Sequence, residues 1–393
     1  MDRARERMGY RQEDVAAALG VARAMISYWE TDRRHPNDRQ LAALGRLYRT
    51  SVASLLTGEG LESGDEEAEM LFRGAEADLP PGARPGIQDF KDFLDGYARL
   101  AEAVGVGFHG MHQSPFVSVR GSGSVDDARR KAEEVRAHLR VGLGPIGDLD
   151  TVCELLGVTV YRTSLGTDLR NTISGGFFAH PLVGFSLLVN LDMTPGRRRF
   201  TVAHELAHAL FHSGPKTRFI LSHATKDPRE RFADWFAGEF LMPTEGVRRV
   251  LDERDLGPRI TEPGEVIHLQ RFFRVSYATA LVRLRQGKFL SQVTYEELQE
   301  IRPVALARAL GYEIDDEEYS QDPEDWRIRR FPSRFLRLLR LGVRNENVSV
   351  PTAAKLTGLS IDEIADLVGD QAFVGEEDRK EIGEYEATGV AGG

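Results

Sequence analysis

The chain has 393 residues, of which 41% are hydrophobic and 28% are charged, and its formal net charge is −10 at pH 7. These proportions predict a globular protein of about two or three domains and argue against a disordered chain. No apolar segment is long enough to predict a membrane-spanning helix, and the first residues lack the apolar core of a signal peptide, so we expect a cytoplasmic protein that does not bind membranes. The single cysteine, Cys153, excludes an internal disulfide and a cysteine-rich zinc site.

Positive charge is concentrated at the start of the chain. Residues 1–57 hold ten arginines and seven acidic residues, so this segment carries a charge of +3. The negative total therefore does not exclude DNA binding by the segment. Short helices that form a small bundle are expected at residues 12–19, 21–30, 41–48 and 51–56. Gly20 ends the first of them, and a tight turn leads into the next, which is the pattern of a helix-turn-helix motif.

Three motifs in this segment follow one another in register: Q-E-x-V-A-x-x-L-G-V from Gln12, I-S-x-W-E from Ile26, and R-x-P from Arg34. On these motifs the segment resembles the helix-turn-helix domain of the XRE (phage-repressor-like) regulators. The resemblance implies a five-helix bundle over residues 1–58 that binds a double-stranded DNA operator. Regulators of this type often bind two half-sites as dimers, so a homodimer is expected. The alternative is a helical bundle that serves only protein contacts.

The same resemblance implies which side chains face DNA, because the second helix of the motif enters the major groove in this family. The residues that would face bases or nearby phosphates are Arg23, Ala24, Met25, Ser27 and Tyr28. Those that would hold the DNA backbone, which sets affinity rather than sequence choice, are Gln12, Arg33 and Arg34. Ala24 and Met25 depart from the polar residues often found at these positions, which favours contacts with thymine methyl groups.

Residues 59–124 are expected to form a linker and one amphipathic helix. Glycine, proline and acidic residues dominate the stretch from 58 to 86. Residues 87–104 then place apolar side chains on one side of a helix, which could pack on the next domain or on a second copy of the chain.

A central domain with helices and a small sheet is expected over residues 125–290. Its first elements are helices at 127–139 and 146–156 and strands at 158–161, 173–179 and 184–190. Near its end, residues 266–284 predict two short helices, interpreted as packing elements beside the candidate site. The chain as a whole is therefore predicted to be mainly α, with one α+β domain.

Residues 204–208 form an H-E-x-x-H motif on a predicted amphipathic helix of residues 199–212, for which Thr201 is the expected start. His204 and His208 would lie on one helical face with about 6 Å of rise between them, so both imidazoles can reach one zinc ion. Glu205 would then lie near the water that the metal activates and could take its proton. The alternative is a buried helix that carries incidental histidines.

A second helical run, from Glu230 to Pro243, offers the third ligand. Glu230 and Asp234 lie four residues apart and therefore on one face of a helix. Glu230 could complete a His₂Glu site that leaves a fourth position open, as catalytic zinc requires. Asp234 could accept the free N–H of a ligand histidine and fix its tautomer.

Other side chains near the motif are weaker candidates. His212 lies about 12 Å of rise from His204, so we expect it to contact a ligand or the substrate rather than the metal. His223 and Asp227 are candidates for a lid or for alternate ligands. The metzincin spacing, H-E-x-x-H-x-x-G-x-x-H, is absent. The candidates for an oxyanion donor are His212, His223 and Tyr161.

Four stretches carry a second resemblance: I-S-G at 173–175, L-V-N at 188–190, R-F-T-V-A-H-E-L-A-H-A-L-F-H at 199–212, and E-R-F-A-D-W-F-A-G-E-F-L-M-P at 230–243. Over residues 125–285 the chain resembles the ImmA/IrrE family of zinc metallopeptidases. The resemblance implies a zincin-like catalytic domain with Glu205 as general base and Zn²⁺ bound by His204, His208 and Glu230. Some members of this family cut a partner XRE repressor, and others are fused to their own XRE domain.

Residues 291–393 are expected to form a helical module. Residues 331–340 predict a basic amphipathic helix, residues 348–364 predict another helix-turn-helix, and the chain ends in an acidic tail. The region resembles the C-terminal extension of fused regulators that lie beside toxin genes. It is interpreted as a module that docks a partner or supports a dimer.

The sequence thus predicts a DNA-binding regulator with a zinc-dependent endopeptidase domain. Its substrate would be a repressor-type protein, either a partner or the chain itself, in a stress, mobile-element or toxin–antitoxin response. The alternative is a non-proteolytic repressor or antitoxin that binds DNA and a toxin or small-molecule signal through an inactive zincin-like scaffold. The two hypotheses differ at Glu205, because proteolysis needs its carboxylate and metal binding alone does not.

Overall fold

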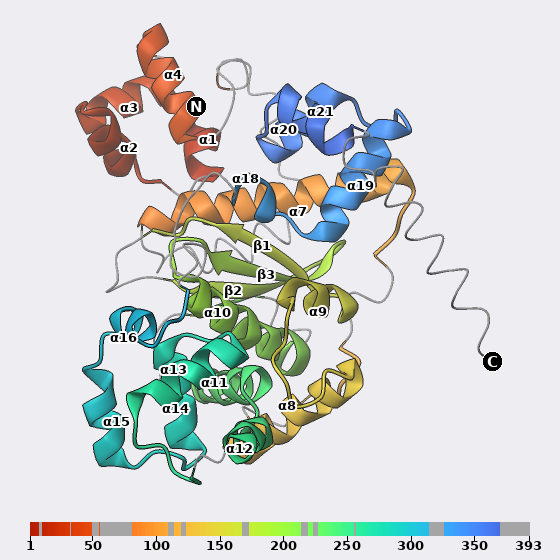
Figure 1. The fold of residues 1–393 in the computed structure, drawn as a ribbon. Coiled ribbons are helices and arrows are strands. Elements are labelled where there is room, and N and C mark those ends of the chain that lie inside the picture. The colour runs from red at the N-terminus through yellow and green to blue at the C-terminus, as the bar shows by residue number, and fades with distance from the viewer. Residues whose placement is uncertain are drawn as a thin grey trace, which may run out of the picture. The chain divides into compact units, whose positions relative to one another are not determined.

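The computed structural model describes residues 1–7, 10–31, 33–48, 55, 81–108, 114–118, 123–166, 173–213, 219–222, 227–254, 257–313 and 326–369. These residues are mainly helical, with one small sheet, as the sequence predicts (Figure 1). They divide into two compact units, one of residues 1–94 with 108–332 and the other of residues 95–107 with 333–393. Among the helices described, none is long and apolar enough to cross a membrane.

Within its described residues, the N-terminal segment forms the short helices α1 (Asp2–Arg7), α2 (Gln12–Leu19), α3 (Arg23–Glu30) and α4 (Asp38–Leu47). Gly20 caps α2 in the left-handed conformation, with φ of 64°, which a residue without a Cβ adopts without strain. The apolar residues Val15, Ile26 and Trp29 are buried together in the core of the bundle. Of the predicted fifth helix at residues 51–56, only Leu55 lies within the described residues, and it is buried.

In the described part of the chain the sheet has four strands, β1 (Thr159–Thr163), β2 (Gly175–His180), β3 (Gly184–Asn190) and β4 (Phe219–Ser222), in the order β1-β3-β2-β4. β1 runs parallel to β3, whereas β2 is antiparallel to both β3 and β4. The ring of His180 closes the β2–β3 hairpin, because its Nδ1 accepts the backbone N–H groups of Leu182 and Val183 at 3.2 and 3.0 Å. The strand β4 was not expected from the sequence.

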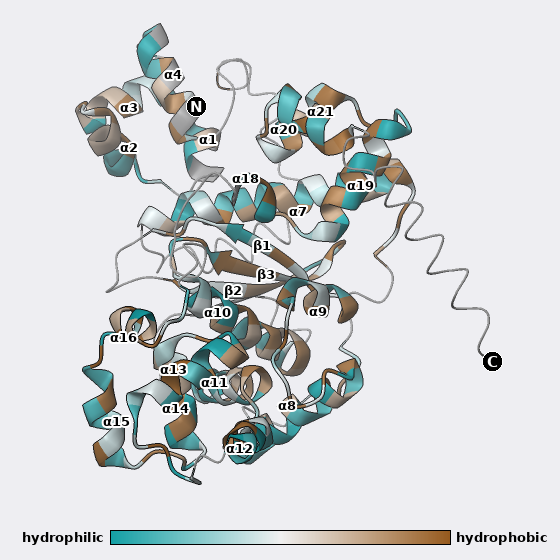
Figure 2. Ribbon diagram, in the orientation of Figure 1, coloured by the Kyte–Doolittle hydropathy of each residue, from teal (hydrophilic) through white to brown (hydrophobic). Residues whose placement is uncertain are grey.

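Helices cover both faces of this sheet (Figure 1). Every residue of β3 is buried, in keeping with its largely hydrophobic sequence (Figure 2). On one face lies α10 (Pro195–Ala207), which packs against β2 and β3. On the other face, the first half of α7 (Arg84–Val104) stacks Phe93 on the ring of Tyr161, with 4.3 Å between ring centroids.

Other described helices of the first unit build the core beneath α10. They are α8 (Val125–Leu139), α9 (Leu149–Leu155), α11 (Pro228–Leu241), α12 (Thr244–Glu253), α13 (Pro263–Phe273), α14 (Tyr277–Gln286), α15 (Gln292–Gln299) and α16 (Pro303–Ala309). The short helix α18 (Trp326–Arg329) lies instead on the α7 side of the sheet (Figure 1). The side chains of Ser124, Asp148, Asp227 and Ser276 cap the helices that follow them by accepting a backbone N–H. Such capping residues explain why these helices begin where they do.

The start of α10 corrects one expectation. The helix begins at Pro195, six residues before Thr201, and Thr194 is its N-terminal cap position. Proline is favoured at the first position of a helix, because its fixed φ suits the helix and its missing N–H would have no partner there. Thr201 instead lies buried inside the helix.

The second unit contains the end of α7 and the helices α19 (Ser333–Arg344), α20 (Val350–Thr357) and α21 (Ile361–Val368). Tyr97 and Phe335 meet edge to face, with ring centroids 5.3 Å apart. Gly358, at φ of 69°, makes the turn between α20 and α21. The helix and the helix-turn-helix pair that the sequence predicts in this region are therefore both present.

Candidate metal centre

The H-E-x-x-H motif occupies the last turn of α10 and the turn that follows it. The backbone is α-helical to Ala207 and then π-helical from His208 to His212. Apolar residues on the same helix, among them Val202 and Leu206, are buried in the core, so the helix is held in place on the sheet. This packing leaves His204 and His208 on the face that meets α11.

Three side chains meet at this face, as the sequence predicts: His204 from α10, His208 from the π-helical turn that follows it, and Glu230 from α11. The Nε2 of His204 lies 3.1 Å from Glu230 Oε2 and 3.2 Å from His208 Nε2. The Nε2 of His208 lies 3.4 Å from Glu230 Oε1. A tetrahedral zinc ion with bonds of about 2.0–2.1 Å has its ligand atoms about 3.3 Å apart. The three donor groups therefore fit the edges of such a coordination shell.

The electrostatics of the cluster also favour a cation. Burial by itself would lower the pKa of His204, but hydrogen bonds with Asp234 and Glu230 outweigh it and raise this pKa to about 10. Burial would raise the pKa of Glu230, but hydrogen bonds with His204 and His208 lower it to about 2. The site thus stabilises positive charge between two carboxylates, which is what a bound divalent cation requires.

Each histidine of the cluster has a partner for its second ring nitrogen. His204 Nδ1 lies 3.0 Å from Asp234 Oδ1, and the side chain of Asp234 is 56% exposed. His208 Nδ1 lies 3.0 Å from the Nδ1 of His212, and His212 is only 8% exposed. The structure therefore brings Asp234 and His212 to the two candidate ligand histidines, one to each.

Glu205 lies on the sheet side of α10, fully buried beside Gly175 of β2. A Cβ on Gly175 would lie 3.4 Å from Glu205 Cγ, 2.6 Å from Thr201 Cγ2 and 2.5 Å from the carbonyl oxygen of Leu188. Only glycine allows the strand to approach the helix this closely. Sequence reasoning did not assign Gly175 a role, although the two glycines at the start of a strand were a signal of close approach.

Two other sequence-based candidates are placed elsewhere. Asp227 caps α11 and accepts from Arg229 Nε and Nη2 at 3.0 and 2.7 Å, so its carboxylate is engaged at the start of the helix. Tyr161 projects to the opposite face of the sheet, where its hydroxyl donates to Asp89 at 3.0 Å, so it cannot be the oxyanion donor. His223 lies outside the described residues.

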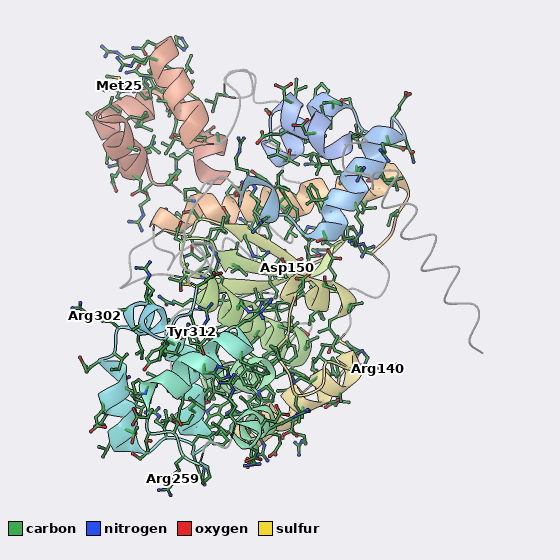
Figure 3. All side chains as sticks on the ribbon, viewed as in Figure 1. Met25, Arg140, Asp150, Arg259, Arg302 and Tyr312 are labelled. Atoms are coloured by element: carbon green, nitrogen blue, oxygen red, sulfur yellow. The ribbon has the colours of Figure 1, made fainter. Side chains whose placement is uncertain are left out.

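The predicted DNA-facing residues lie on and around α3. Arg23, Ala24 and Tyr28 are exposed, and Tyr28 retains 40% of its surface. Met25, marked in Figure 3, and Ser27 are partly buried, and Met25 also packs against the core of the bundle. The side chain of Gln12 donates to Glu30 at 2.8 Å, whereas Arg33 and Arg34 are exposed after the end of α3.

Comparison with known families gives two matches in separate parts of the chain. Residues 153–285 match the family model described as IrrE N-terminal-like domain. Residues 1–55 match the family model described as helix-turn-helix. A search of curated proteins finds no match. The first match contains the whole candidate metal cluster, and the second contains all the predicted DNA-facing residues.

Proposed function

We propose that this chain, a fusion of an XRE-type helix-turn-helix domain with an ImmA/IrrE-type metallopeptidase domain, cleaves a repressor-type protein in a zinc-dependent reaction. The fusion makes it a DNA-binding regulator, and the proposal concerns what its second domain does. The observation that carries it is the cluster of two imidazole nitrogens and one carboxylate, with 3.1–3.4 Å between donor atoms. Glu205 follows His204 directly in sequence, and its charge acts to raise the pKa of the His204 ring.

The donor set favours zinc over harder cations. His204 and His208 supply imidazole nitrogens and Glu230 supplies a carboxylate oxygen, which together suit zinc, while calcium and magnesium prefer oxygen ligands alone. Zinc held by three side chains keeps a coordination position for a ligand, polarises a carbonyl group and makes a water molecule more acidic.

Glu205 is the residue proposed to move the proton. Its carboxylate follows the ligand His204 directly in sequence and would accept a proton from the attacking water. It would then donate this proton to the nitrogen of the leaving amine, so that the peptide bond is hydrolysed and Glu205 is restored. Asp234 would hold His204 in the tautomer that leaves Nε2 free for the metal.

The class of substrate follows from the joining of the two domains in one chain. A peptidase attached to a DNA reader is concentrated near proteins bound at the same operator, because tethering raises the effective concentration of the second partner. A repressor there, or the helix-turn-helix segment of this chain, is the substrate we propose. Cleavage would release the DNA in a stress, mobile-element or toxin–antitoxin response.

An E205Q variant is suited to capture the substrate, because it keeps the zinc ligands and loses the proton acceptor. Proteins that co-purify with tagged E205Q, and the purified chain itself, would be incubated with zinc-loaded wild type and followed by mass spectrometry. We expect one captured protein, or the chain itself, to gain a defined new N-terminus with wild type and not with E205Q.

The proposal fails if the wild type carries one zinc ion per chain and every captured protein, and the chain itself, stays intact. Cleavage by E205Q at the wild-type rate would instead remove Glu205 from the mechanism. A stable complex without cleavage would favour a non-proteolytic repressor or antitoxin.

A further inference from the structure

The ring of His212 makes a close contact with the ring of His208 in a turn that is not α-helical. Their Nδ1 atoms are 3.0 Å apart, and their ring centroids are 5.0 Å apart. The turn that carries both rings is the π-helical segment from His208 to His212, and turns of this kind are rare and are frequent at functional sites. The other side of the His212 ring meets Phe232 of α11, 4.9 Å between centroids.

A hydrogen bond between two ring nitrogens requires one donor and one acceptor. The Nε2 of His208 faces His204 Nε2 at 3.2 Å and Glu230 Oε1 at 3.4 Å, so it is the nitrogen that turns its lone pair to the metal. The proton of a neutral His208 must then lie on Nδ1. His212 Nδ1 is therefore the acceptor, and His212 carries its own proton on Nε2.

We propose that His212 is a positioning residue that fixes the tautomer and the ring orientation of the ligand His208 through this Nδ1–Nδ1 hydrogen bond. The inference rests on the proposed zinc site and adds a residue that acts on it without touching the metal. The two proposed ligand histidines then have unlike partners, since His204 is held by the exposed carboxylate of Asp234 and His208 by the buried imidazole of His212.

Loss of such a partner is expected to weaken metal binding. Hydrogen-bond partners of ligand histidines typically contribute about 10–100-fold to metal affinity. The turn is held by the packing of His212 and Phe211 among the phenylalanines of α11, so the backbone should keep its path when one ring nitrogen is removed. The effect should therefore appear in affinity rather than in folding.

Three substitutions separate the hydrogen bond from the volume of the side chain. H212N places its amide oxygen the same number of bonds from Cβ as the Nδ1 of histidine, so it keeps an acceptor near His208. H212Q carries the same amide one bond further out, and H212F keeps an aromatic ring with no acceptor. Zinc affinity of each full-length variant would be measured by competition with a chromophoric chelator, with circular dichroism to confirm the fold.

We expect H212F and H212Q to lose about 10–100-fold in zinc affinity, and H212N to recover most of it. In the zinc-loaded wild type, ¹⁵N NMR of the imidazoles should assign the proton to Nδ1 of His208 and to Nε2 of His212. The inference is overturned if H212F, H212N and H212Q all bind zinc with the same affinity. It is also overturned if the NMR places the proton on Nε2 of His208 or on Nδ1 of His212. Failure of the wild type to bind zinc would instead reject the metal site on which the inference rests.

Discussion

His204 Nδ1 and Asp234 Oδ1 lie 3.0 Å apart and connect α10 to α11 on the solvent side of the metal centre. Asp234 follows Glu230 by one helical turn, so a single face of α11 presents both a proposed metal ligand and the partner of another proposed ligand. The geometry of the centre therefore depends on how firmly α11 is held beside α10.

Removal of Asp234 should weaken metal binding while leaving the fold intact. The D234A variant leaves the Nδ1 of His204 to water, so we expect zinc affinity to fall by about 10–100-fold, and D234N to fall less because an amide oxygen can still accept. Affinity would be measured by chelator competition. D252N, at an exposed aspartate of α12, is the matched control, and an equal loss in that variant would contradict a specific role for Asp234.

A buried ion pair at the end of α11 should be important for stability. Arg283 of α14 pairs with Glu239 and donates from Nε to the carbonyl of Met242 at 2.9 Å, and both side chains are almost fully buried. Breaking a buried pair from one side leaves an uncompensated charge, which costs about 3–5 kcal/mol. We expect losses of this size in the free energy of unfolding for E239A and for R283A, measured by urea denaturation.

The double substitution E239M/R283M is the control for that prediction. Replacing both charges with apolar side chains leaves no unpaired charge, so the double variant should be more stable than either single variant. A double variant that loses the sum of the two single effects would show that the residues act independently.

Adding one methyl group at Gly175 should disturb both the sheet and Glu205. A Cβ at this position would lie 2.5 Å from the Leu188 carbonyl oxygen and 3.4 Å from Glu205 Cγ, so the strand or the helix must shift. We expect G175A to lose about 1–3 kcal/mol of stability and to lose cleavage activity more than zinc affinity. Gly147 has open space around it, so G147A is the control. Normal stability of G175A would contradict the close packing.

The helix cap at Asp148 gives a pH-dependent prediction. Burial acts to raise the pKa of Asp148, but hydrogen bonds from Thr151 and from the backbone of Asp150 outweigh it and lower this pKa. A carboxyl group whose pKa is lowered in the folded state stabilises the protein at pH values above its unfolded pKa, which is about 3.9. This stabilisation is lost as the pH falls through the lower pKa of the folded state.

We therefore expect D148A to be less stable than wild type by about 1 kcal/mol at pH 7, and the difference to shrink below about pH 4. Urea unfolding at a series of pH values from about 2.5 to about 7 measures this difference. D148N keeps an acceptor without a titrating charge and should vary less with pH. A difference between D148A and wild type that stays constant through the acid range would contradict the assignment.

DNA binding should depend on the arginines after α3 in a salt-dependent way. Arg33 and Arg34 are exposed, and we propose that each contacts a phosphate. Removal of one phosphate contact lowers the slope of log affinity against log salt by about 1. R33A and R34A should therefore bind all DNA sequences more weakly and with a smaller slope. R302A, at an exposed arginine outside the N-terminal helices, should leave the slope unchanged.

The sequence was most informative where chemistry depends on spacing within one helix. Residues four apart must share a helical face, so the proximity of His204 to His208 and of Glu230 to Asp234 could be predicted from position alone. Spacing alone could not predict that the two pairs meet, because this depends on the tertiary packing of α10 on α11. The family resemblance supplied that step.

Other features depend on contacts that a single sequence does not contain. The four-residue strand β4 is defined by its pairing with β2, and its apolar letters alone do not separate a strand from a loop. The π-helical turn from His208 to His212 keeps the sequence pattern of an ordinary helix. The sequence could not show which face of the sheet Tyr161 occupies, because that depends on strand register. In the structure the register places Tyr161 on the face away from the metal centre, where its hydroxyl donates to Asp89.

The most direct measurement compares new protein N-termini in cells that carry the wild type or E205Q, under several stresses. Zinc content of both purified proteins is determined in parallel, so that the variants differ only at the proton acceptor. Termini found only with the wild type are the predicted result, and they would name the substrate. Identical profiles, with zinc bound to both proteins, would contradict a peptidase and leave a DNA-binding regulator whose metal site performs no hydrolysis.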